Sequence, residues 1–220
     1  MQLLEAYMRI KICGIKYRDQ GKFIVDIGAT ALGFICVPQS PRFVNAEQIK
    51  LVTEVIPKHI DKIGVFANSC VENIRNVVIN SDLTGIQLHG DESVDFCISL
   101  RESLPGIEVI KALRIREIGD LEKVAIYKDY VDYLLLDAYD GQQLGGTGKT
   151  IDWQILKYLE PGILWFLAGG LRPNNIVKAL IELKPSGIDL SSGVESSPGN
   201  KDLEKVTQLF EQLSQVNISK

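Results

Sequence analysis

The sequence lacks any stretch approaching the roughly 18 to 20 consecutive apolar residues that a membrane-spanning helix needs. It also lacks a basic N-terminal segment followed by an apolar one, which is the pattern of a secretory signal. We therefore expect a soluble, cytoplasmic chain with no membrane among its partners.

Charge of one sign is nowhere concentrated. The 24 basic and 28 acidic residues are spread along the whole chain and give a formal net charge of -4. Proteins that bind nucleic acids by charge carry basic clusters, which this sequence does not have. We therefore expect no nucleic-acid partner.

Cysteine and histidine are few and scattered. There is no Cys-x-x-Cys pair and only two imidazoles, so neither a zinc site nor any other metal or cofactor is expected. Isolated thiols also suit a reducing cytosol. These residues are Cys13, Cys36, Cys70, Cys97, His59 and His89.

The sequence does contain a repeated alternation of short β-branched runs and longer amphipathic stretches. Each run and the stretch after it have the length of a strand, a crossover helix and two loops, the unit of a parallel sheet. Eight units predict a (β/α)8 TIM barrel, with an open doubly wound sheet as the alternative. The runs begin near Arg9, Ala31, Asp61, Thr84, Ile107, Val131, Ile163 and Gly187.

The length and the apolar content of 45% indicate one domain, which we place at residues 9–220 after a short extension, 1–8. Helical spacing of apolar residues predicts helices over 45–57, 174–183 and 202–213. Pro173 is expected to open the second of these helices.

Two long loops are expected, over 38–44 and 138–150. In a barrel both would open on the face where the strands end, which is where barrel enzymes place their active sites. Candidate site residues are therefore sought where the predicted strands end.

The first predicted strand ends in Cys13 and the sixth in Asp137. A thiol and a carboxyl group facing each other across the barrel mouth could act as a base and an acid, and Lys11 could favour the thiolate. The alternatives are a small buried cysteine and an aspartate that caps a helix or a turn. Gly14 is expected to let a ligand approach closely.

Glycine-rich turns follow the seventh and eighth predicted strands, where many barrels bind phosphate. The loop at 145–150 resembles a nucleotide-binding P-loop, but Gln143 stands where that motif needs a glycine. We expect this loop to be a lid whose amides and Lys149 enclose the substrate. The predicted phosphate-binding residues are Gly146, Gly169, Gly170, Ser191, Ser192 and Gly193.

Two more side chains belong to the same expected face. Arg42 lies in the first long loop and could hold a carboxylate, or it could be a solvated surface arginine. His89 ends the fourth predicted strand and could position a substrate, or it could be a structural histidine.

Together these segments resemble the phosphoribosylanthranilate isomerase family of tryptophan biosynthesis, over nearly the whole chain from Arg9. The resemblance rests on seven segments in order. They are Lys-Ile-Cys-Gly at 11–14, Ser-Pro-Arg at 40–42, Gln-Leu-His-Gly at 87–90, Leu-Leu-Asp at 135–137, Gly-Gly-Thr-Gly-Lys at 145–149, Ala-Gly-Gly-Leu at 168–171 and Asp-Leu-Ser-Ser-Gly-Val-Glu at 189–195.

The resemblance implies an Amadori rearrangement of N-(5'-phosphoribosyl)anthranilate to 1-(2-carboxyphenylamino)-1-deoxyribulose 5-phosphate, without a cofactor. It implies that Asp137 is the general acid, that Cys13 is the general base and that Arg42 binds the substrate carboxylate. We expect a small phosphorylated substrate and either a monomer or a homodimer. One departure is Lys16, because the family commonly has a threonine at this point.

Three other functions stay open at this point. An isomerase of the histidine-pathway type resembles the reaction but uses two aspartates, whereas the first strand here ends in Cys13. An indole-glycerol-phosphate synthase needs a lysine acid and a glutamate on the strands, and these are not seen in the expected places. A phosphate-binding barrel without turnover would be expected to lack the acid or the base.

Overall fold

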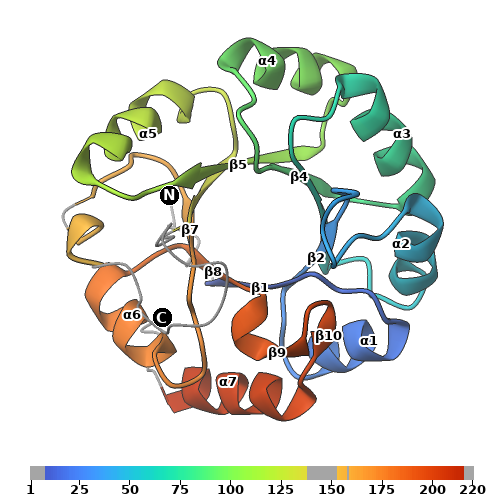
Figure 1. The fold of residues 1–220 in the computed structure, drawn as a ribbon, viewed down its shortest axis with the longest axis vertical. Helices are drawn as coiled ribbons and strands as arrows, with labels where there is room; N and C mark the ends of the chain where they lie inside the picture. The colour runs from blue at the N-terminus through green and yellow to red at the C-terminus, as the bar shows by residue number, and fades with distance from the viewer. Residues whose placement is uncertain (1–7, 138–152, 158, 216–220) are drawn as a thin grey trace, which may run out of the picture.

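The computed structural model describes residues 8–137, 153–157 and 159–215. Eight strands pair in parallel in sequence order, and β8 pairs with β1 to close the barrel (Figure 1). The TIM barrel is therefore confirmed and the open sheet excluded. The strands are β1 Arg9–Cys13, β2 Ala31–Ile35, β3 Asp61–Phe66, β4 Gly85–Leu88, β5 Glu108–Arg114, β6 Tyr133–Asp137, β7 Trp165–Ala168 and β8 Gly187–Leu190.

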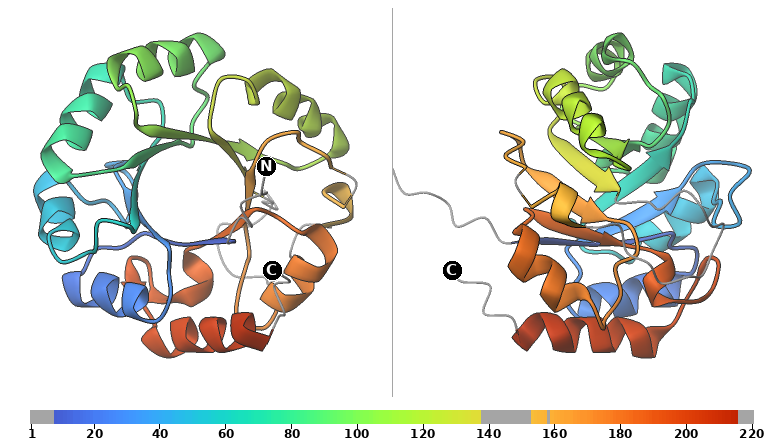
Figure 2. Two further views of the ribbon diagram at one scale, coloured as in Figure 1. Left: turned by 180° about the vertical axis from the view of Figure 1, so that it is seen from behind. Right: turned by 60° about the vertical axis from the view of Figure 1, so that its left-hand side comes forward.

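Helices form a ring outside the barrel, as Figure 1 and the view from behind in Figure 2 show. Among the described residues the sixth unit contributes a short 3-10 helix, η2 Trp153–Ile155, in place of the α-helix expected there. The α-helices are α1 Arg18–Asp26, α2 Ala46–Thr53, α3 Val71–Ser81, α4 Val94–Ser103, α5 Glu122–Tyr127, α6 Ile176–Leu183 and α7 Leu203–Gln215. The remaining elements are η1 Ile118–Leu121, η3 Ser192–Val194, β9 Glu195–Ser197 and β10 Asn200–Lys201.

Helix α2 begins where the sequence predicted because Asn45 caps it. The Asn45 side chain accepts from the backbone N–H of Gln48, and the Gln48 side chain accepts from the backbone N–H of Asn45. The helix ends at Thr53, four residues before the predicted end. Helix α7 lies within two residues of its prediction.

The expectation that Pro173 opens a helix is wrong, because α6 begins at Ile176. The Asn175 side chain accepts from the backbone N–H of Arg172 and donates to the carbonyl of Gly170. These bonds hold the preceding residues in a turn, since an asparagine side chain that bonds nearby backbone competes with helix formation.

Apolar side chains pack in two places, between the strands and the helices and inside the barrel. The inner cluster consists of Ile63, Ile110, Ala112, Leu135, Phe166 and Ala168. Polar side chains share the interior with it, most clearly along β1, where Arg9, Lys11 and Cys13 alternate and face inward.

The end of the barrel where the strands begin is closed by an ion cluster around Arg9. The Arg9 guanidinium lies 2.7 Å from the Asp61 carboxylate and 2.8 Å from the Glu108 carboxylate. It also lies over the rings of Tyr133 and Phe166, at 4.7 and 5.1 Å from their centroids. The Arg9 cluster therefore fills the barrel interior at this end, and we call it the plug.

Two properties of the described part bear on possible partners. None of its helices has the length and apolar character needed to cross a membrane. Within the same ranges, no three His, Cys, Asp or Glu side chains are grouped so that they could hold a metal ion.

Candidate active site

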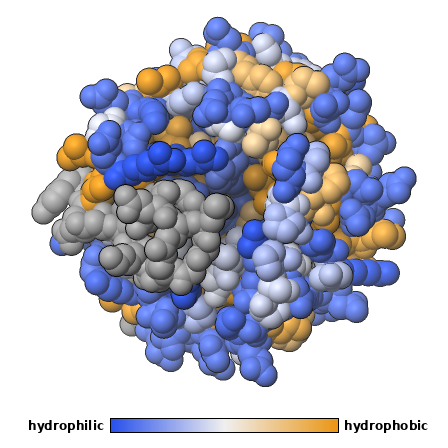
Figure 3. Space-filling view, in the orientation of Figure 1, coloured by the Kyte–Doolittle hydropathy of each residue, from blue (hydrophilic) through white to orange (hydrophobic). Residues whose placement is uncertain are grey.

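A cavity of about 300 Å³ lies at the ends of the strands. It brings together every predicted site residue that the structure describes: Cys13, Arg42, His89, Asp137, Gly169, Gly170, Ser191, Ser192 and Gly193. Gly146 and Lys149 lie outside the described residues. In Figure 3 hydrophilic residues predominate on the face seen in Figure 1, and the surface is hollowed near its middle.

Cys13 ends β1 and is 5% exposed, yet it lines the cavity. Burial raises the pKa of its thiol above the ordinary value, and the nearby Lys11 ammonium offsets only part of that rise. Lys11 therefore acts in the expected direction, but the protonated thiol is still the favoured form. Cys13 is thus buried, as the alternative of a small buried cysteine predicted, but it also lines the cavity.

Lys11 lies fully buried beside Cys13, on the inner face of β1. Its ammonium donates to Gln87 Oε1 at 2.6 Å and to Asp189 Oδ2 at 3.0 Å. Burial lowers the pKa of Lys11, but the Asp189 carboxylate more than compensates and the pKa is raised. The contact with Asp189 therefore holds Lys11 as a cation inside the barrel.

Gln87 and Asp189 were not predicted as site residues, although both stand in segments that carry the family resemblance. Both line the cavity and both are buried. The sequence feature that could have identified them is a polar residue at an inward position of an otherwise apolar strand, because a buried polar group requires a hydrogen-bonding partner.

Asp137 ends β6 with 19% of its side chain exposed, so the partial desolvation expected of a general acid is present. His89 follows β4, and its Nε2 lies 3.5 Å from Asp137 Oδ2. The other ring nitrogen, Nδ1, lies 2.9 Å from Gln87 Nε2. His89 therefore stands between the buried polar interior and the carboxyl group.

A second buried ion pair supports the loop that carries His89. Lys111 Nζ lies 2.9 Å from Glu92 Oε2 and also donates to the carbonyls of Leu88 and Gly90. Burial raises the pKa of Glu92, but hydrogen bonds from Lys111 and from the Asn68 backbone outweigh burial and the pKa is lowered. The pair fixes the backbone on both sides of His89.

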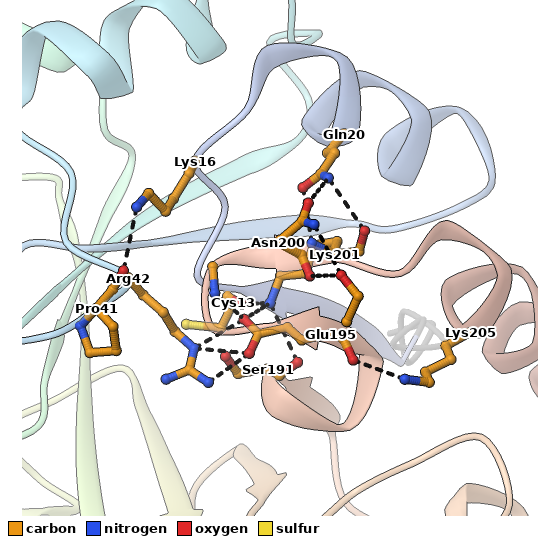
Figure 4. Close-up of polar contacts among 12 residues, drawn as sticks. Cys13, Lys16, Gln20, Pro41, Arg42, Ser191, Glu195, Asn200, Lys201 and Lys205 are labelled. Atoms are coloured by element: carbon orange, nitrogen blue, oxygen red, sulfur yellow. Dashed lines mark hydrogen bonds and ion pairs between the residues drawn. The ribbon is translucent and has the colours of Figure 1, made fainter.

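Arg42 reaches the cavity from the loop after β2, and it is not a solvated surface residue (Figure 4). Its Nε lies 3.0 and 3.1 Å from the two carboxylate oxygens of Glu195, and its Nη2 lies 2.6 Å from Oε2. The Nη1 group is not used in these bonds. Glu195 therefore orients the guanidinium and leaves one edge for another acceptor.

Lys201 completes this network from the β9–β10 hairpin (Figure 4). Its fully buried ammonium lies 2.8 Å from Glu195 Oε1 and donates to the carbonyls of Cys13 and Ser191. Burial lowers the pKa of Lys201, although the Glu195 carboxylate opposes this. Nothing in the local sequence distinguished Lys201 from a surface lysine.

The structure gives a reason for Gly14 within the protein, while the close approach of a ligand there stays a prediction. The Gly14 φ of +81° is a conformation that favours glycine, and a Cβ there would lie 2.9 Å from Cδ of Arg42. The glycine therefore makes room for the arginine of the site itself. Lys16, where the sequence departs from the family, donates to the carbonyl of Pro41 and so reaches the same loop (Figure 4).

The turns after β7 and β8 meet at the cavity. Gly169 and Gly170 have positive φ of 87° and 64°. A Cβ on Gly193 would lie 1.8 Å from the carbonyl oxygen of Leu171, so only glycine lets the two turns approach so closely. The geometry brings these turns together beside Cys13 and Asp137, and phosphate binding by them stays a prediction.

The profile described as "N-(5'phosphoribosyl)anthranilate (PRA) isomerase" matches residues 10–212. This chain belongs to that family. The isomerase of this name from Trichormus variabilis is 58% identical over 210 residues, covering 96% of this chain and 100% of that protein. The relative from Nostoc punctiforme is 59% identical over 206 residues, covering 94% of this chain and 98% of that protein.

Solved structures of phosphoribosylanthranilate isomerases share the fold. The enzyme from Thermotoga maritima superposes with a TM-score of 0.87 at 34% identity, covering 96% of this chain and all of that one. Another holds reduced 1-(o-carboxyphenylamino)-1-deoxyribulose 5-phosphate and gives a TM-score of 0.84 at 32% identity with the same coverage. The resemblance inferred from the sequence is therefore confirmed, and the chain is an isomerase of tryptophan biosynthesis.

Proposed function

We propose that this chain converts N-(5'-phosphoribosyl)anthranilate into 1-(2-carboxyphenylamino)-1-deoxyribulose 5-phosphate, with Asp137 as the general acid and Cys13 as the general base. The observation that carries the proposal is that one cavity is lined by a thiol, a carboxyl group and the two glycine-rich turns. This is the set of groups that an Amadori rearrangement of a sugar phosphate requires.

The reaction begins with ring opening. Asp137 gives its proton to the furanose ring oxygen, the bond between this oxygen and the first sugar carbon breaks, and a protonated Schiff base forms with the anthranilate nitrogen. The position of Asp137 supports this role, because its carboxyl group lines the cavity at the end of β6 beside His89.

Cys13 then removes the proton from the second sugar carbon as its thiolate. The electron pair of that C–H bond moves toward the Schiff base and gives an enolamine, which tautomerises to the ketone. The first carbon is reduced and the second oxidised, so no external redox partner enters. The raised pKa of Cys13 means a small thiolate population but a stronger base, and Lys11 supplies the charge that stabilises it.

Binding of the substrate is assigned to groups around this pair. The free edge of Arg42 is suited to the anthranilate carboxylate, and the turns at Gly169 and Ser191 to the phosphate. Gly146, predicted to bind phosphate, and Lys149, predicted to belong to a lid, lie outside the described residues. A cytoplasmic location and a monomeric or homodimeric state stay predictions.

The test is the anthranilate fluorescence of the substrate, which falls as the substrate is consumed. Asp137→Asn and Cys13→Ser should each lower kcat by on the order of 10²- to 10⁴-fold, because each removes one proton-transfer group. Cys70→Ser is the matched control, since Cys70 is exposed and does not line the cavity. Wild-type rates for either site variant would contradict the proposal, as would turnover of only the imidazole carboxamide substrate of histidine biosynthesis.

A further inference from the structure

We propose that Gln87 is a positioning residue that fixes the ring proton of His89 on Nε2, so that this N–H faces Asp137. The proposal deepens the proposed function and rests on it in one respect, the assignment of Asp137 as the acid. It follows from a chain of polar contacts that crosses the barrel interior from β8 and β1 to β4 and β6.

This series of hydrogen bonds has a direction because Lys11, at its start, can only donate. An ammonium group has three N–H donors and no acceptor. Lys11 is held as a cation by Asp189, whose Oδ2 lies 3.0 Å from Lys11 Nζ. The amide atom of Gln87 that lies 2.6 Å from Lys11 Nζ must therefore be its oxygen.

This orientation decides which group Gln87 presents to His89. With the amide oxygen on Lys11, the NH₂ group of Gln87 lies 2.9 Å from His89 Nδ1. A donor at this distance requires an acceptor, so Nδ1 must carry a lone pair. In a neutral imidazole the proton is then on Nε2, which lies 3.5 Å from Asp137 Oδ2.

The orientation of the Gln87 amide is fixed because Gln87 and Lys11 are buried side by side. Gln87 is 1% exposed and Lys11 is fully buried. Rotating the amide of Gln87 by half a turn would set its NH₂ group against the Lys11 ammonium, donor against donor. Lys111, paired with Glu92, also holds the backbone on both sides of His89, which limits how far the ring can shift.

The consequence for the chemistry lies at Asp137. When the acid gives its proton to the ring oxygen, its O–H bond breaks and a carboxylate is left. An N–H that already faces Oδ2 stabilises this charge as it develops, while His89 keeps its own proton. With the proton on Nδ1 instead, the Nε2 lone pair would face the carboxylate and oppose the step.

Histidine nitrogen NMR tests the proposal directly, because the ¹⁵N shifts of Nδ1 and Nε2 distinguish the two neutral tautomers. The chain has only two histidines, so His59 is an internal reference and a His59→Gln variant assigns the spectrum. We expect wild-type His89 to carry its proton on Nε2. Gln87→Glu keeps an acceptor for Lys11 but presents a carboxylate to His89, so the proton should appear on Nδ1.

The same variant has a kinetic consequence that a merely structural role would not give. For Gln87→Glu we expect kcat to fall on the order of tenfold to a hundredfold while KM changes little, because only the developing charge at Asp137 loses its donor. Gln48→Glu is the matched control. It adds the same charge on an exposed helix and can keep the capping bond to Asn45, so both kcat and the His89 spectrum should stay as in wild type.

Three results would overturn the proposal: a wild-type proton on Nδ1, an unchanged tautomer in Gln87→Glu, or a tautomer that changes in Asp137→Asn instead. If Gln87→Glu does not fold, Gln87→Leu removes the donor without adding charge and should show both tautomers. The spectra are taken without substrate, so failure of the acid assignment, seen as full activity of Asp137→Asn, would be distinguishable from failure of the tautomer assignment.

Discussion

The two ends of the barrel use buried charge in different ways. At the end where the strands begin, the Arg9 guanidinium is shared between Asp61 and Glu108, and aromatic rings cover it. At the other end, Arg42 bonds Glu195 through Nε and Nη2, and the Nη1 edge of its guanidinium stays available. Asp137 lies 3.5 Å from His89 Nε2, which is longer than the contacts of the Arg9 cluster. One end is saturated by its own partners, and the other keeps capacity for a ligand.

The difference shows that a buried charged group indicates a binding function only when its partners leave some of its hydrogen-bonding groups unused. A saturated cluster contributes shape and stability, whereas a partly used one is oriented in advance for a group that it does not yet hold. Substitutions that remove one partner at a time can separate the two cases.

The largest expected effect on stability comes from Glu92→Gln, which leaves the buried Lys111 ammonium without its counter-charge. We expect a loss of about 3–5 kcal/mol in the free energy of unfolding at pH 7, measured by urea denaturation. The pKa of Glu92 is lowered from its ordinary 4.5, so its contribution is present above that pH and is lost as the pH falls through the folded value. The difference between wild type and variant should therefore shrink as the pH falls below 4.5, and a constant difference would contradict the assignment.

A smaller loss is expected for Arg9→Met at the closed end. Asp61 is 41% exposed and can be hydrated, so we expect about 2–4 kcal/mol in the free energy of unfolding. The folded fraction should keep kcat within about twofold, because this cluster does not line the cavity.

Lys22→Ala is the control for the Arg9 variant, since the exposed Lys22–Asp26 pair should contribute no more than about 0.5 kcal/mol. If Arg9→Met lowered kcat more than tenfold while remaining folded, the closed end would have a part in catalysis and the contrast between the ends would fail.

Apart from the Lys22 control, the smallest expected effect is that of Arg42→Lys at the open end. A lysine cannot reproduce the planar contact with Glu195 and present a second edge, so KM should rise about tenfold, equivalent to about 1.4 kcal/mol. The role proposed for Arg42 is to bind the anthranilate carboxylate, which is separate from the reacting sugar carbons, so kcat should change little. Steady-state kinetics measures both constants, and a lower kcat with unchanged KM would contradict the role in binding.

Much of the fold could be predicted because each strand begins at the predicted residue or one or two residues later. The β-branched runs are separated by turn residues, and this periodicity is a local property of the chain. The end of α2 and the start of α6 could not be placed as well, because they depend on side chains that bond nearby backbone. In the sixth unit, the described residues contain the 3-10 helix η2 where an α-helix was expected.

The candidate site divides in the same way. Residues at strand ends, such as Cys13 and Asp137, were found because a barrel places all strand ends on one face. The partners of those residues were not. Glu195 and Lys201 act on Arg42 and Cys13 through contacts between segments far apart in the chain, and the sequence alone cannot show which charged residues meet.

Strand β1 links the closed end of the barrel to the cavity, because Arg9, Lys11 and Cys13 occupy alternate positions along it and all face inward. Inserting or deleting one residue between Arg9 and Cys13 would turn at least one of the three outward, toward the helices. Single substitutions in this strand therefore change one inward position at a time. A change in the length of the strand would instead displace the Arg9 ion cluster relative to Lys11 and Cys13 in a single step.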